Sequence, residues 1–135
     1  MNQSNDIIFA PGYACLRPLL DGPGAQKVEM NTETLLVLCT CPDKEVAETI
    51  ATRLVEDGQA ACVNRIPDIS SVYKWQGKLE SDTEELLLIK STSAAFADLQ
   101  QTIKHLHPYE LPEIIAVPIA AGSDAYLDWI RESTR

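Results

Sequence analysis

The sequence predicts an α+β fold in which one sheet carries two helices on one face. Three observations support this prediction. Apolar segments of strand length alternate with two segments of helical periodicity. A Gln-Gly pair separates two long segments that favour strands, as expected of a tight hairpin turn. The chain has 135 residues, which suits one domain with its own core.

The first strand and first helix are predicted from residue 35 onward. Residues 35–39 form a short, continuous apolar run, which is typical of a buried strand. Pro42 and Asp43 then favour a helix start, with proline in the first turn and aspartate as the N-terminal cap. Apolar residues recur at helical spacing over residues 46–55. Gly58 suits the C-terminal cap.

A long hairpin is predicted next. The second strand is expected over residues 60–66, and pairing should resume over residues 70–75 after an interruption at residues 67–68. The Gln-Gly pair at residues 76–77 provides the turn, in which glycine supplies a positive φ. The third strand is expected to run over residues 78–90. These strands are long and partly apolar, so their edges are expected to pair with other copies of the chain.

The rest of the chain completes the fold. A hydroxyl group among residues 91–93 is expected to cap a second helix, whose apolar stripe extends over residues 96–106. A fourth strand is predicted over residues 114–117, and Pro118 marks its end or an edge position. A short last helix should begin at residues 122–124. This order is that of a ferredoxin-like β-α-β-β-α-β sandwich with an additional C-terminal helix.

Two regions of the chain are distinguished by composition. Residues 1–30 are rich in proline and glycine and show no apolar period, so we expect an irregular leader there. This leader could be disordered, and Met30 could be an alternative start. Residues 31–135 are expected to form the folded domain.

Charge and cysteine content narrow the class of protein. The net charge is −9, and an acidic surface repels phosphate groups, so nucleic-acid binding is not expected. No apolar stretch approaches the ~20 residues of a membrane span. The first residues lack the basic and apolar regions of a signal peptide. We therefore expect a cytoplasmic protein whose four cysteines are free thiols.

Two stretches contain candidate metal ligands. Cys39 lies at the end of the first strand, and His107 lies in a proline-rich loop after the second helix. Thiolate and imidazole suit copper or zinc better than magnesium or calcium. Glu110 or Glu113 could add an oxygen ligand. No set of four ligands has zinc-finger spacing, so a closed structural site is not expected.

Cys41 follows Cys39 by two residues. Alternate residues of a strand share a side, so the two cysteines should point the same way if the strand continues.

Each of these residues also has an ordinary structural explanation. Cysteine is among the most buried residue types, so Cys39 could simply pack in the core, and Cys62 is expected there. His105 near a helix C-terminus would interact favourably with the helix dipole. His107, before a proline, could be a solvated loop residue. No arrangement of nucleophile and base is recognisable, so binding rather than catalysis is expected.

These segments together resemble the CutA-type divalent-cation tolerance proteins. The resemblance extends from residue 35 to about residue 130, in order and without a large gap. It begins with Leu38-Cys39-Thr40, and two strings are specific: Tyr73-Lys74-Trp75-Gln76-Gly77 and His107-Pro108-Tyr109-Glu110-Leu111-Pro112-Glu113.

The resemblance implies a cytoplasmic homotrimer, assembled by strand pairing between subunits and involved in tolerance to copper and other divalent ions. It also implies that Cys39 and His107 are the metal ligands. Some members carry a second histidine where this chain has Leu106, and His105 is displaced by one position, which turns it ~100° away on a helix. A neighbouring subunit or water would have to complete the coordination.

Two alternative functions remain open from the sequence. The first is a trimeric signalling or scaffold module that binds a small ligand or partner protein in a cleft between subunits. Lys90, Trp75, Tyr109 and Glu113 would line that cleft. The second is an enzyme with His107 and Glu113 as acid and base, for which the sequence indicates no substrate.

Overall fold

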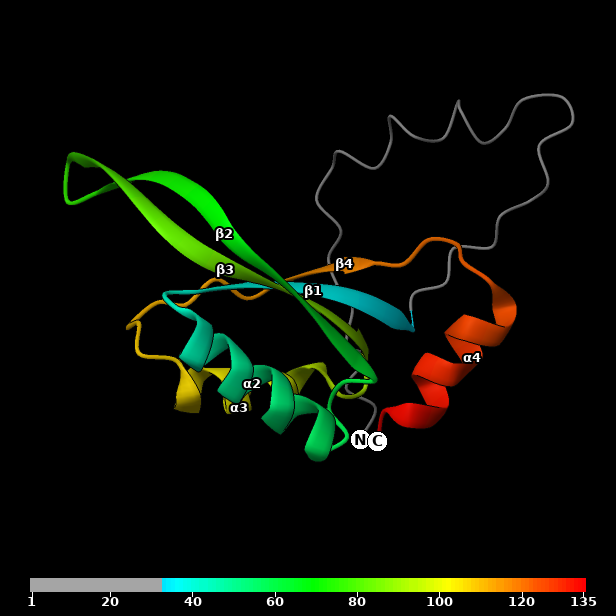
Figure 1. Ribbon diagram of the computed structural model, residues 1–135. Coiled ribbons are helices and arrows are strands. Elements are labelled where there is room, and N and C mark those ends of the chain that lie inside the picture. The colour runs from blue at the N-terminus through cyan, green and yellow to red at the C-terminus, as the bar shows by residue number, and fades with distance from the viewer. Residues whose placement is uncertain (1–32) are drawn as a thin grey trace, which may run out of the picture.

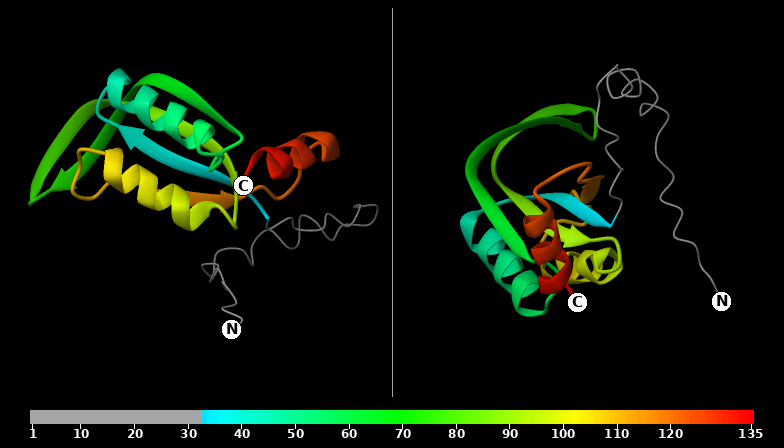
Figure 2. Two further views of the ribbon diagram at one scale, coloured as in Figure 1. Left: turned by 90° about the horizontal axis from the view of Figure 1, so that it is seen from below. Right: turned by 90° about the vertical axis from the view of Figure 1, so that its right-hand side faces the viewer.

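The computed structural model describes residues 33–135. The predicted leader at residues 1–30 and Cys15 lie outside this range. The described chain forms one sheet with helices α2 and α3 side by side on one of its faces (Figures 1 and 2), which confirms the predicted α+β fold. Its elements are β1 (Thr34–Cys41), α2 (Lys44–Glu56), β2 (Cys62–Trp75), β3 (Lys78–Thr92), α3 (Phe96–Leu106), β4 (Ile115–Pro118) and α4 (Asp124–Ser133).

The sheet has four strands in the order β2-β3-β1-β4, and each neighbouring pair is antiparallel. The apolar first strand is flanked on both sides, because Leu38 pairs with Leu88 of β3 and with Ile115 of β4. Strand β4 lies at an edge and ends at Pro118, which lacks the N–H group that a further ladder bond would need. The order is that of the predicted ferredoxin-like domain.

The hairpin of β2 and β3 extends beyond the rest of the sheet and curves over the face opposite the helices (Figures 1 and 2). Its turn has positive φ at both Gln76 and Gly77, as a two-residue turn of type I′ requires. The expected interruption of β2 is a bulge within one continuous strand, with the register shift between Ile66 and Ile69. Asp68 adopts a φ of 57° there, a conformation that aspartate tolerates better than most residues.

The core lies between the sheet and helices α2 and α3. Alternate residues of β1 and β3 face the helices and are buried. The helices contribute a stripe of buried apolar residues each, Ala47, Ile50, Ala51 and Leu54 from α2 and Leu99 and Ile103 from α3. Each large aliphatic side chain buried in this way contributes about 1.5–3 kcal/mol to folding. The largest of these side chains are Leu35, Leu87, Ile89, Ile50, Leu54, Leu99 and Ile103.

The predicted aspartate cap of α2 and the glycine after this helix are confirmed, whereas the predicted position of Pro42 and the predicted cap of α3 are wrong. Asp43 caps α2 by accepting a hydrogen bond from the Val46 N–H at 2.9 Å, and Pro42 precedes the cap rather than occupying the first turn. Gly58 has a φ of +69° just after α2. The expected hydroxyl cap of α3 is wrong: Ala95 is the N-cap residue, without a side-chain hydrogen bond to the helix.

Helix α4 packs against one end of the sheet, away from the tip of the hairpin (Figure 1). Leu127 and Ile130 are its buried residues. Within residues 33–135, no helix is long and apolar enough to cross a bilayer.

Candidate metal centre

Two cysteines point from β1 toward the helices. Cys39 and Cys41 are separated by one residue in an extended strand, so both side chains lie on the same face of the sheet. Both are completely buried and form part of the hydrophobic core. The prediction that the two residues share a side is therefore confirmed, and the core position of Cys39 agrees with the ordinary structural explanation given as its alternative.

His107 joins these cysteines from the other half of the chain. It is the C-cap residue of α3, and its N–H donates a hydrogen bond of 2.8 Å to the Ile103 carbonyl. Its extended backbone suits a residue that precedes proline. The side chain is only 6% exposed, so His107 is not a solvated loop residue. One ligand atom from each of Cys39, Cys41 and His107 lies within 4.8 Å of the others.

The imidazole of His107 is held by two backbone groups. Its Nδ1 accepts a hydrogen bond of 3.1 Å from the Tyr109 N–H. Its Nε2 lies 2.8 Å from the carbonyl oxygen of Thr40, the residue between the two cysteines. A carbonyl oxygen can only accept, so Nε2 carries the hydrogen and the ring is neutral in this arrangement. Both ring nitrogens are therefore already engaged.

The Cys39 thiol is strongly held in its protonated form. A hydrogen bond with Cys41 raises the pKa of Cys39 most, and burial raises it further. The negative charges of Glu113 and Glu84 act in the same direction. A thiolate at this position requires a positive charge close to the sulfur, which a bound metal ion would supply.

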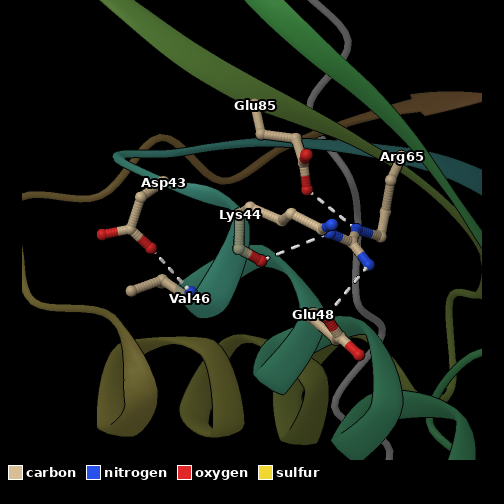
Figure 3. A network of polar contacts seen from close by, with 6 residues as sticks. All are labelled: Asp43, Lys44, Val46, Glu48, Arg65 and Glu85. Carbon is tan, nitrogen blue, oxygen red and sulfur yellow. Dashed lines mark hydrogen bonds and ion pairs between the residues drawn. The ribbon is translucent and has the colours of Figure 1, made fainter.

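A charged network connects β2 and β3 to the start of α2 (Figure 3). Glu85 is the register partner of Cys41 on β3 and is 5% exposed. Its carboxylate accepts a hydrogen bond of 2.8 Å from Nε of Arg65, and that bond raises the pKa of the guanidinium. Arg65 also donates to the Lys44 carbonyl and approaches Glu48. The network compensates the buried charge of Glu85 and ties β2 and β3 to α2.

The other predicted ligand residues do not join the cluster. In the described part of the chain, Cys39, Cys41 and His107 form the one group of three whose ligand atoms are close enough to hold a metal ion. Glu110 and Glu113, considered as oxygen donors, instead line a neighbouring cavity. The signal that identifies Cys41 as a third candidate ligand was its two-residue spacing from Cys39 in a strand.

The remaining histidine and cysteine are placed differently. His105 is exposed in the last turn of α3, where a basic residue complements the helix dipole. Leu106 packs against the core. The expectation that Cys62 is a core residue is wrong: it is half-buried, with its Sγ 4.0 Å from Nζ of Lys90. Residues near the start of β2 lie at the edge of the sheet and are covered on fewer sides.

A cavity of about 480 Å³ lies on the opposite face of the sheet. Successive residues of a strand point to opposite faces of the sheet. Thr40 lies between Cys39 and Cys41, so its side chain points away from the cysteines, and it lines the cavity. Glu84 of β3 is nearly buried there and accepts a hydrogen bond of 3.1 Å from the Tyr109 hydroxyl. The lining residues are Thr40, Tyr73, Trp75, Glu84, Pro108, Tyr109, Glu110, Leu111 and Glu113.

Three of the four residues predicted to line a ligand cleft, Trp75, Tyr109 and Glu113, meet at this cavity within a single chain. The fourth, Lys90, does not line it. Its ammonium group lies near Cys62 instead.

Comparison with known proteins gives consistent results. Residues 35–133 match the family described as CutA1 divalent ion tolerance protein. A curated relative from Thermus thermophilus, the divalent-cation tolerance protein CutA, is 54% identical over 99 residues, which cover 73% of this chain and 96% of the relative. The chloroplastic protein CutA of Arabidopsis thaliana is 44% identical over 112 residues, covering 81% of this chain and 62% of that protein.

Solved structures agree with these sequence matches. The divalent cation tolerance protein Cut A1 from Thermus thermophilus superimposes with a TM-score of 0.75 at 53% sequence identity. The match covers 76% of this chain and 99% of that structure. Shared sequence and shared fold therefore coincide over the domain that carries Cys39 and His107.

Proposed function

The chain belongs to the CutA1 divalent ion tolerance family, and on this basis we propose that it binds copper or another divalent metal ion as a homotrimer. Cys39 and His107 are the ligands, and Cys41 is a third. The observation that carries the proposal is the convergence of two sulfur atoms and an imidazole nitrogen within 4.8 Å. Relatives named divalent-cation tolerance proteins support it.

The donor set determines which ions fit. Two thiolates and one imidazole favour copper or zinc, because soft and borderline ions prefer sulfur and nitrogen. Magnesium and calcium prefer oxygen donors, and the three residues provide none. A three-residue set leaves a coordination position for water or another donor.

Metal binding at this site must release protons. The Cys39 thiol is protonated. A ring nitrogen of His107 can coordinate an ion only after its hydrogen bond with the Tyr109 N–H or the Thr40 carbonyl is broken. Affinity should therefore rise with pH, because ligands must lose protons before they coordinate. The cluster is also buried, so the loop after α3 must move for an ion to enter.

Assembly is supported by the edge of the sheet. Among residues 33–135, strand β2 has a neighbouring strand on one side only, so its other edge can pair with a second copy. Val72 and Leu79 near the end of the hairpin are 65% and 76% exposed, which is unusual for large apolar residues in a single chain. We place the protein in the cytoplasm, because the described cysteines are free thiols.

The proposal is tested by metal titration of the full chain. The background carries Cys15→Ser, which removes the cysteine outside the described residues. Zn²⁺ and, without oxygen, Cu⁺ are titrated against a competing chelator. Cys39→Ala and His107→Ala should each weaken binding at least about tenfold, and Cys62→Ala is the matched control that should not. Unchanged affinity in both ligand variants, with native circular dichroism, would contradict the proposal.

A ligand-binding or scaffold role is the second candidate function, and the cavity favours it. A catalytic role is less well supported. His107 forms its hydrogen bonds with the backbone of Thr40 and Tyr109, and within residues 33–135 it has no hydrogen bond to Glu113. We therefore propose a binding protein rather than an enzyme.

A further inference from the structure

The cavity on the face of the sheet opposite the helices is lined by acidic residues and, among residues 33–135, by no basic one. Three of its lining residues are Glu84, Glu110 and Glu113, and none is basic. Glu84 is only 7% exposed, and in the described part of the chain it forms no ion pair. Its hydrogen-bond donor is the neutral phenol of Tyr109. A buried carboxylate without a cation is costly, so this site favours a positively charged group.

Aromatic rings surround the same cavity. Tyr73 and Trp75 come from β2, and Tyr109 comes from the loop after α3. The Tyr73 hydroxyl donates to Asp82, just as the Tyr109 hydroxyl donates to Glu84. The faces of aromatic rings attract cations, most strongly where water is excluded.

The ligand is expected to be organic rather than a bare metal ion. In residues 33–135 the carboxylates of the cavity do not form a group of three close enough to hold an ion. Pro108 and Leu111 add apolar surface to the lining, which suits a carbon skeleton. The volume of about 480 Å³ lies in the range of small-molecule sites.

From these observations we infer that the cavity binds a small organic cation, an ammonium or guanidinium group on a short carbon chain. Glu84 holds the charged group at the closed end, and Trp75, Tyr73 and Tyr109 surround it. This inference specifies the ligand class of the second candidate function. It does not depend on metal binding, because β1 separates the cavity from the cysteines.

The sequence provides a selective reporter for this test. It contains two tryptophans, Trp75 in the cavity and Trp129 on α4. A full-length chain with Trp129→Phe therefore reports on the cavity through the fluorescence of Trp75 alone. Agmatine and tetramethylammonium are the cationic probes, and 1,5-pentanediol is the neutral control of similar length.

Glu84→Gln is the decisive variant, since it removes the charge and keeps the shape. The matched control is Glu132→Gln, the same change on an exposed residue of α4, away from the hairpin. Agmatine should change the fluorescence saturably, with at least tenfold weaker binding in Glu84→Gln and unchanged binding in Glu132→Gln. If Glu84→Gln does not fold, the exposed Glu113→Gln variant takes its place.

Three outcomes would overturn the inference. They are equal affinity in the Glu84→Gln and parent proteins, an equal response to pentanediol, and no response to either cation.

Light scattering on the same samples identifies one further case. If Glu84→Gln changes the mass of the assembly while the probes do not bind, the cationic group is a basic side chain of a neighbouring copy and not a free ligand. Zn²⁺ should still bind in all these proteins, because none of the substitutions removes Cys39, Cys41 or His107, so failure here is distinguishable from failure of the metal proposal.

Discussion

The carbonyl oxygen of Thr40 lies 2.8 Å from Nε2 of His107. Thr40 stands between Cys39 and Cys41, and its side chain lines the cavity on the other face of the sheet. A metal ion that takes Nε2 must break this hydrogen bond. Occupancy of the metal centre is thereby linked to the backbone that forms one wall of the cavity.

Loss of the His107 side chain should destabilise the metal-free protein. His107→Ala removes the partner of the Thr40 carbonyl and of the Tyr109 N–H, and both hydrogen bonds are partly buried. The expected loss in the free energy of unfolding is about 2 kcal/mol, measured by urea denaturation in the presence of a chelator. His105→Ala, on the exposed side of α3, should change it by less than about 0.5 kcal/mol. Equal effects of the two substitutions would contradict the assigned hydrogen bonds.

Thiol alkylation should distinguish the described cysteines. Cys62 is partly accessible, whereas Cys39 and Cys41 are completely buried. In the Cys15→Ser background, iodoacetamide should modify Cys62 first and the other two only after unfolding, because the reactive species is an accessible thiolate. Peptide mass spectrometry over time provides the measurement. Rapid modification of Cys39 in the native protein would show that the cluster is open.

The protein should lose stability at high pH because of two tyrosines. A hydrogen bond to Asp82 raises the pKa of Tyr73 to about 12, and burial raises the pKa of Tyr109 to about 12, from an ordinary value of 10.0. The folded chain therefore keeps protons that the unfolded chain loses. Their contribution to stability is fully present below pH 10 and is lost as the pH rises toward 12.

Absorbance at 295 nm follows this ionisation directly. Native protein should show two tyrosines that ionise late, and Tyr109→Phe should remove one of them. Tyr126→Phe, on α4, is the control, and in this variant both tyrosines that ionise late should still be observed. Ionisation of all tyrosines around pH 10 in the native protein would rule out the described hydrogen bonds.

The ion pair between Arg65 and Glu85 should be strongly coupled. Arg65→Met leaves the largely buried Glu85 without its cation, and the free energy of unfolding should fall by clearly more than it does in the exposed Arg53→Met variant. The double variant Arg65→Met with Glu85→Gln should lose much less than the sum of the single changes. The exposed pair Arg53 and Asp57, at 2.8 Å, provides a comparison cycle with an expected coupling below about 1 kcal/mol. Additive effects at Arg65 and Glu85 would contradict the network of Figure 3.

Most of the fold could be predicted because its signals are local. The apolar run of β1, the periodicity of α2 and the Gln-Gly turn each depend on neighbouring residues. The cap of α3 could not be predicted in this way, because the hydroxyl groups before it serve other bonds. Ser91 donates to the Gln59 carbonyl at 2.6 Å, and Thr92 accepts from the Ala95 N–H in the preceding turn.

The candidate sites were harder to predict than the fold, because they depend more on tertiary structure. A strand places Cys39 and Cys41 on one face, and that relationship was visible in the sequence. The approach of His107 to both sulfurs depends on how α3 packs, which no local pattern shows. The cavity was harder still to predict, because its lining residues come from β1, from the hairpin of β2 and β3 and from the loop that contains Tyr109.

The bulge in β2 marks a point at which metal binding and ligand binding in the cavity can be separated by engineering. Beyond it, residues 69–75 extend roughly 20 Å at the usual rise of a strand, and they carry Tyr73 and Trp75 to the cavity. Cys39, Cys41 and His107 lie in the body of the domain and do not use this extension. A protein with a shortened hairpin should therefore keep its metal ligands while losing the aromatic wall, so that each activity can be assayed in isolation.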